Sequence, residues 1–156
     1  CRKEFVSLLP LPPETERESH PVCGVWTMKD LVGHLTAWAE VGVAGLAQVL
    51  EGTTPHFKPI PDFEAWNLEQ ADERANLPWD TIWQAYEASY QSLLSGLDEL
   101  SAEQLAEKFD TPWGSHISLY RWLTIWPLHE REHAIDVRHA LNLSRWPKRL
   151  TEHPHR

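Results

Sequence analysis

The sequence has few cysteines, few basic residues and no long apolar run. Its two cysteines, Cys1 and Cys23, allow at most one disulfide, so the chain is not a disulfide-stabilised scaffold. No apolar run reaches the roughly 18 residues that a membrane-spanning helix needs, so we expect no membrane partner. Lysine and arginine number 14 against 23 aspartates and glutamates, which gives a net charge of −9. An acidic chain without a basic stripe repels phosphate backbones, which argues against nucleic acid as a partner.

The chain has 156 residues, of which 42% are hydrophobic and 24% charged, and these values are typical of a globular protein. We predict one domain over residues 1–156, with a short first helix and a C-terminal tail at 144–156. The sequence shows no targeting signal, and we therefore expect a cytoplasmic location. Nine tryptophans and nine histidines stand out for a chain of this length.

Apolar residues recur with helical spacing along most of the chain, and no segment alternates as a half-buried strand does. Thr27 with Asp30, and Ser101 with Gln104, have the spacing of capping boxes at helix starts. Pro127 falls inside the last helix, where we expect a kink. The sequence predicts helices near 2–9, 27–50, 62–76, 80–97, 101–109 and 117–143, and it predicts no strand.

Three of these helices are long, and together with the N-terminal helix they predict an all-α four-helix bundle. The segment 51–79 separates the second and third bundle helices. A helix over 27–50 is about 36 Å long at about 1.5 Å per residue, and the intervening segment is long enough to cross that distance. These two helices can therefore run parallel, whereas a short hairpin loop would force them to be antiparallel.

The segment His129–His133 reads His-Glu-Arg-Glu-His and places two histidines four residues apart. Histidines at i and i+4 lie on one face of a helix and can bind one metal ion. Both fall on the apolar stripe that includes Trp126 and Val137, so their imidazoles are expected to face the bundle interior. His34 has the same placement on its own helix. Three neutral imidazoles leave coordination positions open for water or substrate, which is typical of a catalytic metal site.

Two other interpretations of these histidines stay open from the residues alone. The pentapeptide at 129–133 also fits the His-Glu-x-x-His and His-x-x-Glu-His patterns of zinc proteases. A small helical bundle, however, offers little sheet edge for an extended peptide. An inward-facing histidine is also commonly a core residue that is hydrogen-bonded to a carbonyl or a carboxylate.

The pattern Trp26-Thr27-x-x-Asp30-Leu31-x-x-His34-Leu35 resembles the second-helix signature of the DinB superfamily, which includes the YfiT-like metal-dependent hydrolases. His129-x-x-x-His133 resembles the histidine pair in the last helix of that family. Trp66-Asn67 and Glu132-His133 are similar to its DfsB/ClbS-type branch. The resemblance covers residues 22–143.

The resemblance implies an up-down-down-up bundle with a long crossover between helices 2 and 3. It implies one divalent metal ion, nickel or zinc with manganese or iron as alternatives, held by His34, His129 and His133. Characterised relatives use the metal to activate a low-molecular-weight thiol for transfer or isomerisation, and ClbS-type relatives hydrolyse a genotoxin. We therefore expect a hydrolase or thiol transferase with a small-molecule substrate. The alternative is a non-catalytic stress-resistance protein that sequesters a metal or a small ligand.

Carboxylates beside the histidines would act as a general base or would orient a metal ligand. Glu132 and Asp136 are the first candidates, and Glu130 is the third. Cys23 has no assigned base and is expected to be inert. The apolar face of the short first helix favours a homodimer. Helical spacing also predicts an aromatic pocket wall, with core packing as the alternative for each residue; its members are Trp38, Trp122, Trp126, Tyr86 and Tyr90.

Overall fold

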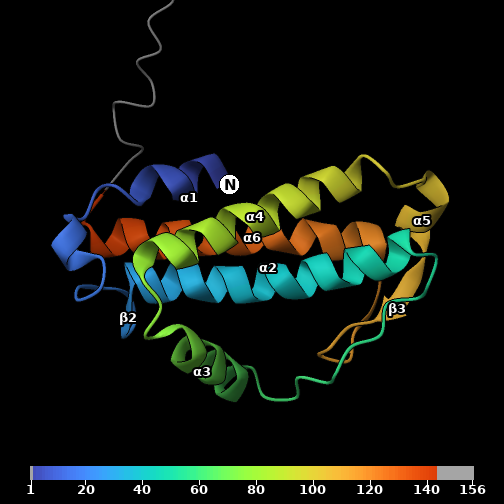
Figure 1. Ribbon diagram of the computed structural model, residues 1–156, viewed down its shortest axis with the longest axis horizontal. Coiled ribbons are helices and arrows are strands. Elements are labelled where there is room, and N and C mark those ends of the chain that lie inside the picture. The colour runs from blue at the N-terminus through green and yellow to red at the C-terminus, as the bar shows by residue number, and fades with distance from the viewer. Residues whose placement is uncertain (1, 144–156) are drawn as a thin grey trace, which may run out of the picture.

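Four helices pack side by side in the computed structural model, which describes residues 2–143 (Figure 1). α2 and α4 run in the same direction, while α1 and α6 run in the opposite direction. The predicted all-α bundle with up-down-down-up topology is therefore confirmed. The four helices are α1 (Arg2–Leu8), α2 (Met28–Leu50), α4 (Trp79–Leu97) and α6 (Leu119–Ala140). None of the helices within residues 2–143 is long and apolar enough to cross a membrane.

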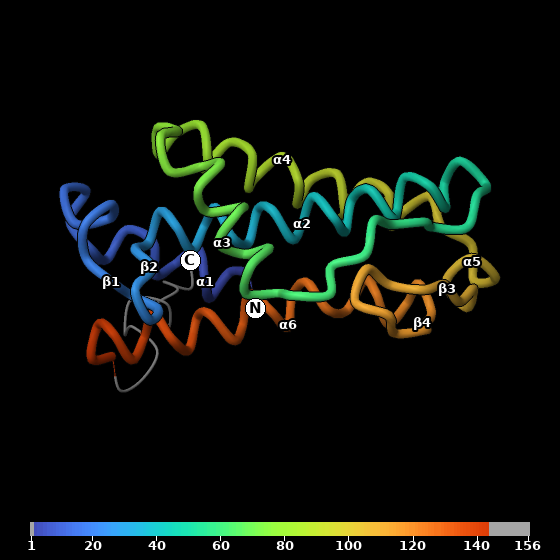
Figure 2. Tube along the Cα trace, turned by 90° about the horizontal axis from the view of Figure 1, so that it is seen from below, coloured from blue at the N-terminus to red at the C-terminus, as the bar shows by residue number. Residues whose placement is uncertain are grey.

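The crossover between α2 and α4 carries α3 (Phe63–Arg74), which packs against α2. It lies outside the bundle, below the four helices in Figure 1 and in front of them in Figure 2. The predicted helices over 27–50, 62–76 and 80–97 agree with α2, α3 and α4 to within two residues at each end. The helix predicted over 101–109 is shorter, because α5 (Ala102–Ala106) ends before Phe109. A single-turn 3-10 helix, Glu14–Glu16, lies in the connection between α1 and α2.

Two short antiparallel hairpins show that the expectation of no strand was wrong. Strands of two or three residues are too short to display the alternation that identifies a strand in sequence. Gly24 and Gly114 have positive φ angles of 57° and 81° and lie between the strands of each hairpin, where such angles favour glycine. The strands are β1 (Pro21–Cys23) with β2 (Trp26–Thr27), and β3 (Lys108–Asp110) with β4 (His116–Ser118).

The two helices that carry the three histidines each have an N-terminal residue whose side chain caps the helix. The Thr27 hydroxyl accepts a hydrogen bond from the Asp30 backbone N–H, and the Asp30 carboxylate accepts one from the Thr27 backbone N–H. The predicted capping box is therefore confirmed. Ser118 caps α6 in the same manner, by accepting from the N–H of Arg121. Each cap fixes where its helix begins, because it satisfies a backbone N–H that has no partner within the helix.

Aromatic side chains of α6 pack directly on the backbone of α2. A Cβ atom added at Gly42 would lie 2.6 Å from the indole of Trp126, so only glycine leaves room for that ring. At Gly45, an added Cβ would lie 2.8 Å from Phe57 and 3.2 Å from Trp122. The two glycines weaken α2 locally, but they allow α2 and α6 to approach closely. This close approach brings the histidines of the two helices together.

Candidate metal centre

Three histidines from two helices converge at one point. Nε2 of His129 on α6 lies 3.0 Å from Nε2 of His34 on α2, and 3.0 Å from Nε2 of His133 one turn along α6. Imidazole nitrogens that share one ion at about 2.0–2.1 Å lie roughly 3 Å apart. The three rings thus form a group that can hold a metal ion.

The electrostatic environment keeps these rings neutral. Burial, followed by the nearby rings of His129 and His133, lowers the pKa of His34 to about 2. Burial and His133 lower the pKa of His129 to about 4. Burial also lowers the pKa of His133, although Asp136 and Glu132 oppose that shift. At neutral pH each imidazole therefore keeps a lone pair, as metal ligation requires.

Asp136 determines which nitrogen of His133 carries the proton. Its Oδ2 atom lies 3.1 Å from Nδ1 of His133. An ionised carboxylate can only accept, so Nδ1 donates and Nε2 keeps its lone pair. A carboxylate that holds the outer nitrogen of a histidine in this way is a common feature of metal sites, because it fixes the ring and raises its basicity.

Hydrogen bonds among the three rings cannot use the hydrogen-bonding capacity of all three Nε2 atoms. Because Nε2 of His133 carries no hydrogen, one well-formed hydrogen bond at most links the three Nε2 atoms. Nδ1 of His34 is buried and has no hydrogen-bond partner within residues 2–143, so Nε2 is the only nitrogen of that ring with a polar contact. A divalent cation would accept the lone pairs of all three Nε2 atoms. The donor set therefore fits a divalent ion.

A cavity of about 710 Å³ opens beside the histidines. Trp38 and Trp126, both predicted for the pocket wall, line it. The indole N–H of Trp38 donates a 2.9 Å hydrogen bond to Oδ1 of Asn67, which ties α3 to α2 at the cavity. The lining residues besides the histidines are Trp26, Trp38, Phe63, Asn67, Trp113, Arg121, Ile125, Trp126, Leu128 and Glu132.

The structure places the other three predicted wall residues elsewhere. Trp122 is fully buried, stacked on Trp113 in the core, and it is not part of the lining of the histidine cavity. Tyr86 and Tyr90 line a separate cavity of about 400 Å³, which shares Trp126 and His129 with the first cavity. Helical spacing predicted correctly that these residues face inward, but it does not determine on which side of His129 they lie.

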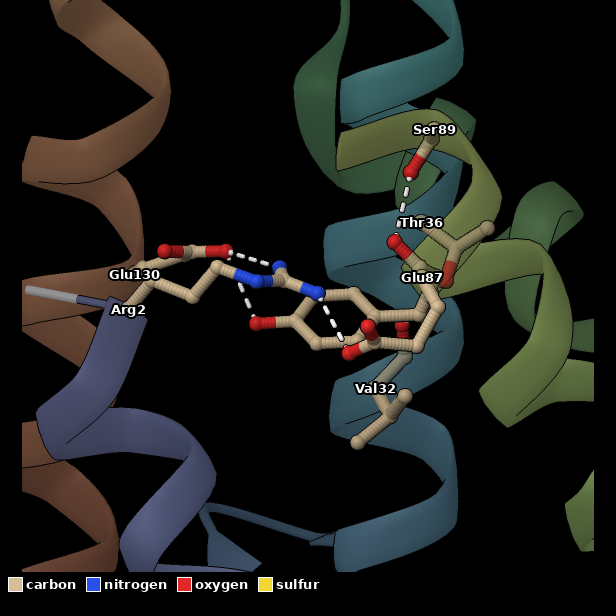
Figure 3. A network of polar contacts seen from close by, with 7 residues as sticks. Arg2, Val32, Thr36, Glu87, Ser89 and Glu130 are labelled. Atoms are coloured by element: carbon tan, nitrogen blue, oxygen red, sulfur yellow. Dashed lines mark hydrogen bonds and ion pairs between the residues drawn. The ribbon is translucent and has the colours of Figure 1, made fainter. Parts of the chain in front are cut away.

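Glu130, predicted as a third candidate base, is engaged with α1 and α4. Its Oε1 atom accepts a 2.8 Å hydrogen bond from the Tyr86 hydroxyl and a 3.0 Å bond from the Arg2 guanidinium. Arg2 also pairs with Glu87 at 2.7 Å (Figure 3). Burial and the Glu130 carboxylate raise the pKa of Tyr86 above its usual range. This buried network joins three helices, and Glu132 and Asp136 are the carboxylates that remain beside the histidines.

Sequence reasoning did not place Cys23 at this site. The β1–β2 hairpin brings its Sγ atom to 3.4 Å from Oδ2 of Asp136 and 3.9 Å from Nδ1 of His133. Burial and Asp136 raise the pKa of the Cys23 thiol to about 11, so the thiol is protonated at neutral pH. The only signal in the sequence is Gly24, which permits the turn of an otherwise unpredicted hairpin.

A family model of the DinB superfamily matches residues 1–136, and the chain belongs to this superfamily. Among solved structures, the fold is similar to mycothiol-dependent maleylpyruvate isomerase, seen in two crystal structures of which one is a mutant. The TM-score is 0.72 at 20% identity, and the alignment covers 86% of this chain and 55% of the isomerase. An uncharacterized protein from Clostridium difficile 630 has a TM-score of 0.72 at 11% identity, with 92% and 90% of the two chains covered. No curated protein matches the chain.

Proposed function

We propose that the chain is a metal-dependent enzyme of the DinB superfamily that acts on a small molecule, either as a hydrolase or as a low-molecular-weight-thiol transferase. His34, His129 and His133 hold one divalent ion, nickel or zinc. The observation that carries the proposal is the convergence of three Nε2 atoms beside an open cavity, with that of His129 3.0 Å from each of the other two. The fold shared with a mycothiol-dependent isomerase supports the thiol branch of the proposal.

A divalent ion bound there would lower the pKa of a water or thiol and would polarise a substrate oxygen. The chain supplies the remaining functions. Asp136 keeps the proton on Nδ1 of His133 and so holds that ring in its ligating tautomer. Glu132 lines the cavity and serves as the proton acceptor for the substrate.

The aromatic wall positions the substrate. Trp38 is held by Asn67 and Trp126 by the backbone of α2, so the two indoles are rigid surfaces. Rigid walls limit the orientations of the substrate when it binds. Less entropy is then lost when the bound substrate reaches the transition state.

Elemental analysis of tag-free protein tests the metal site. We expect about one divalent ion per chain after reloading with nickel or zinc, and we expect its loss in His129→Ala/His133→Ala. His139→Ala is the matched control, since His139 is an exposed histidine on the same helix. Absence of bound metal after reloading, or equal loss in the control, would overturn the proposal.

A turnover assay separates the enzyme from the sequestering protein that the fold also allows. Consumption of L-cysteine with 1-chloro-2,4-dinitrobenzene is followed with the loaded protein and with the double histidine variant. Metal-dependent turnover that the variant lacks supports transfer to or from a thiol. Stoichiometric metal with no turnover of any thiol or ester tested favours sequestration.

A further inference from the structure

A second group of metal-ligating atoms lies on the outer edge of the His133 ring. The group comprises Sγ of Cys23 on β1, Oδ2 of Asp136 on α6, and Nδ1 of His133. The separations are 3.4 Å from sulfur to carboxylate oxygen, 3.9 Å from sulfur to Nδ1, and 3.1 Å from Nδ1 to the same oxygen. Three different ligand types are thus brought together from two elements distant in sequence.

This group is distinct from the three-histidine centre. Nδ1 and Nε2 point away from opposite edges of an imidazole ring, and only Nε2 of His133 faces His129. Cys23 therefore approaches the ring from the side opposite to His34 and His129, and its sulfur is not placed to join an ion held by the three Nε2 atoms. The two groups share His133 but use different nitrogens.

We propose that Cys23, Asp136 and Nδ1 of His133 form a second site for a thiophilic divalent ion such as Zn²⁺ or Cd²⁺, and that this site competes with the three-histidine centre for His133. The competition rests on the function proposed above, whereas the second site itself does not. Thiolate, imidazole and carboxylate form a donor set that zinc accepts at about 2.0–2.3 Å, and the observed separations fit ligands arranged around one such ion. Thiolate is the donor that favours soft ions over harder ones.

The competition follows from the two tautomers of His133. With hydrogen on Nδ1, the ring donates to Asp136 and offers Nε2 to the three-histidine centre. With hydrogen on Nε2, the ring donates to Nε2 of His129 across the same 3.0 Å contact and offers Nδ1 to Cys23 and Asp136. When the soft ion binds, the thiol proton is released to solvent and the ring proton moves from Nδ1 to Nε2. A neutral ring therefore serves one site at a time.

Charge and access suit an ion at this position. A thiolate and a carboxylate together neutralise a divalent ion. The Asp136 side chain is 45% exposed while that of His133 is 14% exposed, so an ion can enter from solvent on the Asp136 side. Because Cys23 contributes no atom to the contacts among the three Nε2 atoms, Cys23→Ser removes no ligand of the first centre, whereas Asp136 also orients His133 for that centre.

Cobalt(II) absorption tests the second site directly, because a thiolate ligand produces a near-ultraviolet charge-transfer band that histidine and carboxylate ligands lack. The protein carries Cys1→Ser, so that Cys23 is its only thiol. In the His34→Ala/His129→Ala background, the first equivalent of cobalt is expected to produce the band. Addition of Cys23→Ser is expected to abolish it. Absence of the band in the folded variant, or its persistence without Cys23, would overturn the proposal.

Alkylation of Cys23 provides a second test that leaves all three histidines in place. One equivalent of Cd²⁺ is expected to slow the reaction of the Cys1→Ser protein with iodoacetamide about tenfold, because a ligated thiolate is not free to attack. Asp136→Ala is expected to remove this protection. An unchanged alkylation rate would overturn the second site, while one nickel ion per chain at the three-histidine centre would still stand.

Nickel tests the shared use of His133. Preloading the Cys1→Ser protein with one equivalent of Ni²⁺ is expected to raise the Cd²⁺ concentration needed for protection of Cys23 by about tenfold, because the ring is then committed through Nε2. Protection that does not depend on Ni²⁺ would overturn the competition.

Discussion

The hydroxyl of Tyr86 on α4 donates a 2.8 Å hydrogen bond to Oε1 of Glu130 on α6, and both side chains are buried. Glu130 directly follows His129 in sequence, so the same turn of α6 carries a metal-ligand candidate and a residue bound to α4. Arg2 on α1 donates to the same carboxylate oxygen and lies over the Tyr86 ring. The network therefore fixes the rotation of α6 at the position where His129 must face His34.

We predict that Glu130→Ala destabilises the fold without removing the metal site. Loss of the carboxylate leaves the Tyr86 hydroxyl without its acceptor and leaves Arg2 paired with Glu87 alone. Removing one partner of such a buried pair lowers the free energy of unfolding by about 3 kcal/mol. Tyr86→Phe removes one hydrogen bond to a charged group and should cost about 2 kcal/mol. Urea denaturation measures both effects. A Glu130→Ala protein of normal stability that binds no metal would show instead that Glu130 belongs to the metal centre.

Asp136→Asn is expected to weaken metal binding about 10–100-fold, because the amide no longer holds the proton on Nδ1 of His133 as a carboxylate does. Glu132→Gln is the comparison, since Glu132 lies near the same ring but makes no hydrogen bond to it in the described residues. Its effect on metal affinity should be several-fold smaller. Competition with a chromophoric chelator measures both affinities. Equal losses in the two variants would contradict the assignment of Asp136 as the residue that orients His133.

The bundle was predictable because its signals are local. The Thr27 cap, the apolar stripe of α2 and the long crossover each act within one helix or one connection, and each is confirmed. The hairpins were missed because two or three residues per strand carry too little pattern, although Gly24 and Gly114 allow the tight reversals. Hairpins as short as these depend on tertiary contacts with residues that are distant in sequence, and a short segment of sequence does not reveal such contacts.

The sequence predicted which side chains of the site face the bundle interior, but not which neighbouring element each of them contacts. Spacing identified His34, His129 and His133 as inward-facing, and the structure brings their Nε2 atoms together. The same spacing grouped Trp122 and Tyr86 with them, because it does not distinguish the two sides of a helix that packs against several neighbours. Glu130 was a candidate because it adjoins His129 in sequence, and the structure engages it with Arg2 and Tyr86 instead. Cys23 was left out because its position depends on a hairpin rather than on a helix.

Gly42→Ala is expected to lower the free energy of unfolding by about 1–3 kcal/mol. The new methyl group would lie 2.6 Å from the Trp126 ring, and relief of that overlap requires the indole or α2 to move. Gly33→Ala on the same helix is the control. Its methyl group would lie 3.3 Å from the flexible side chain of Arg74, so the gain in helix propensity should make it neutral or stabilising. Thermal unfolding measures both, and similar destabilisation in the two variants would argue against the close packing of α2 on α6.

Arg121 is expected to select anionic ligands in the cavity beside the histidines. It lines that cavity eight residues before His129, about 12 Å along the helix. Its guanidinium makes no ion pair within the part of the chain that the structure describes, although the chain as a whole carries a net charge of −9. Among the tryptophans of the wall, an unpaired cation favours an aromatic molecule with an anionic group at the end remote from the metal centre.

Two fluorescent probes of similar shape test this selection. Arg121→Gln should weaken binding of the anion 1-anilinonaphthalene-8-sulfonate about three- to fivefold, which is the size of one partly exposed charge interaction. Binding of the uncharged N-phenyl-1-naphthylamine should not change, because it uses only the aromatic wall. Arg131→Gln is the matched control, since Arg131 is an exposed arginine on the same helix and is not among the lining residues of the cavity. Equal weakening of both probes would mean that Arg121 supports the wall rather than the charge of the ligand, and equal weakening by Arg131→Gln would mean that net charge alone is responsible.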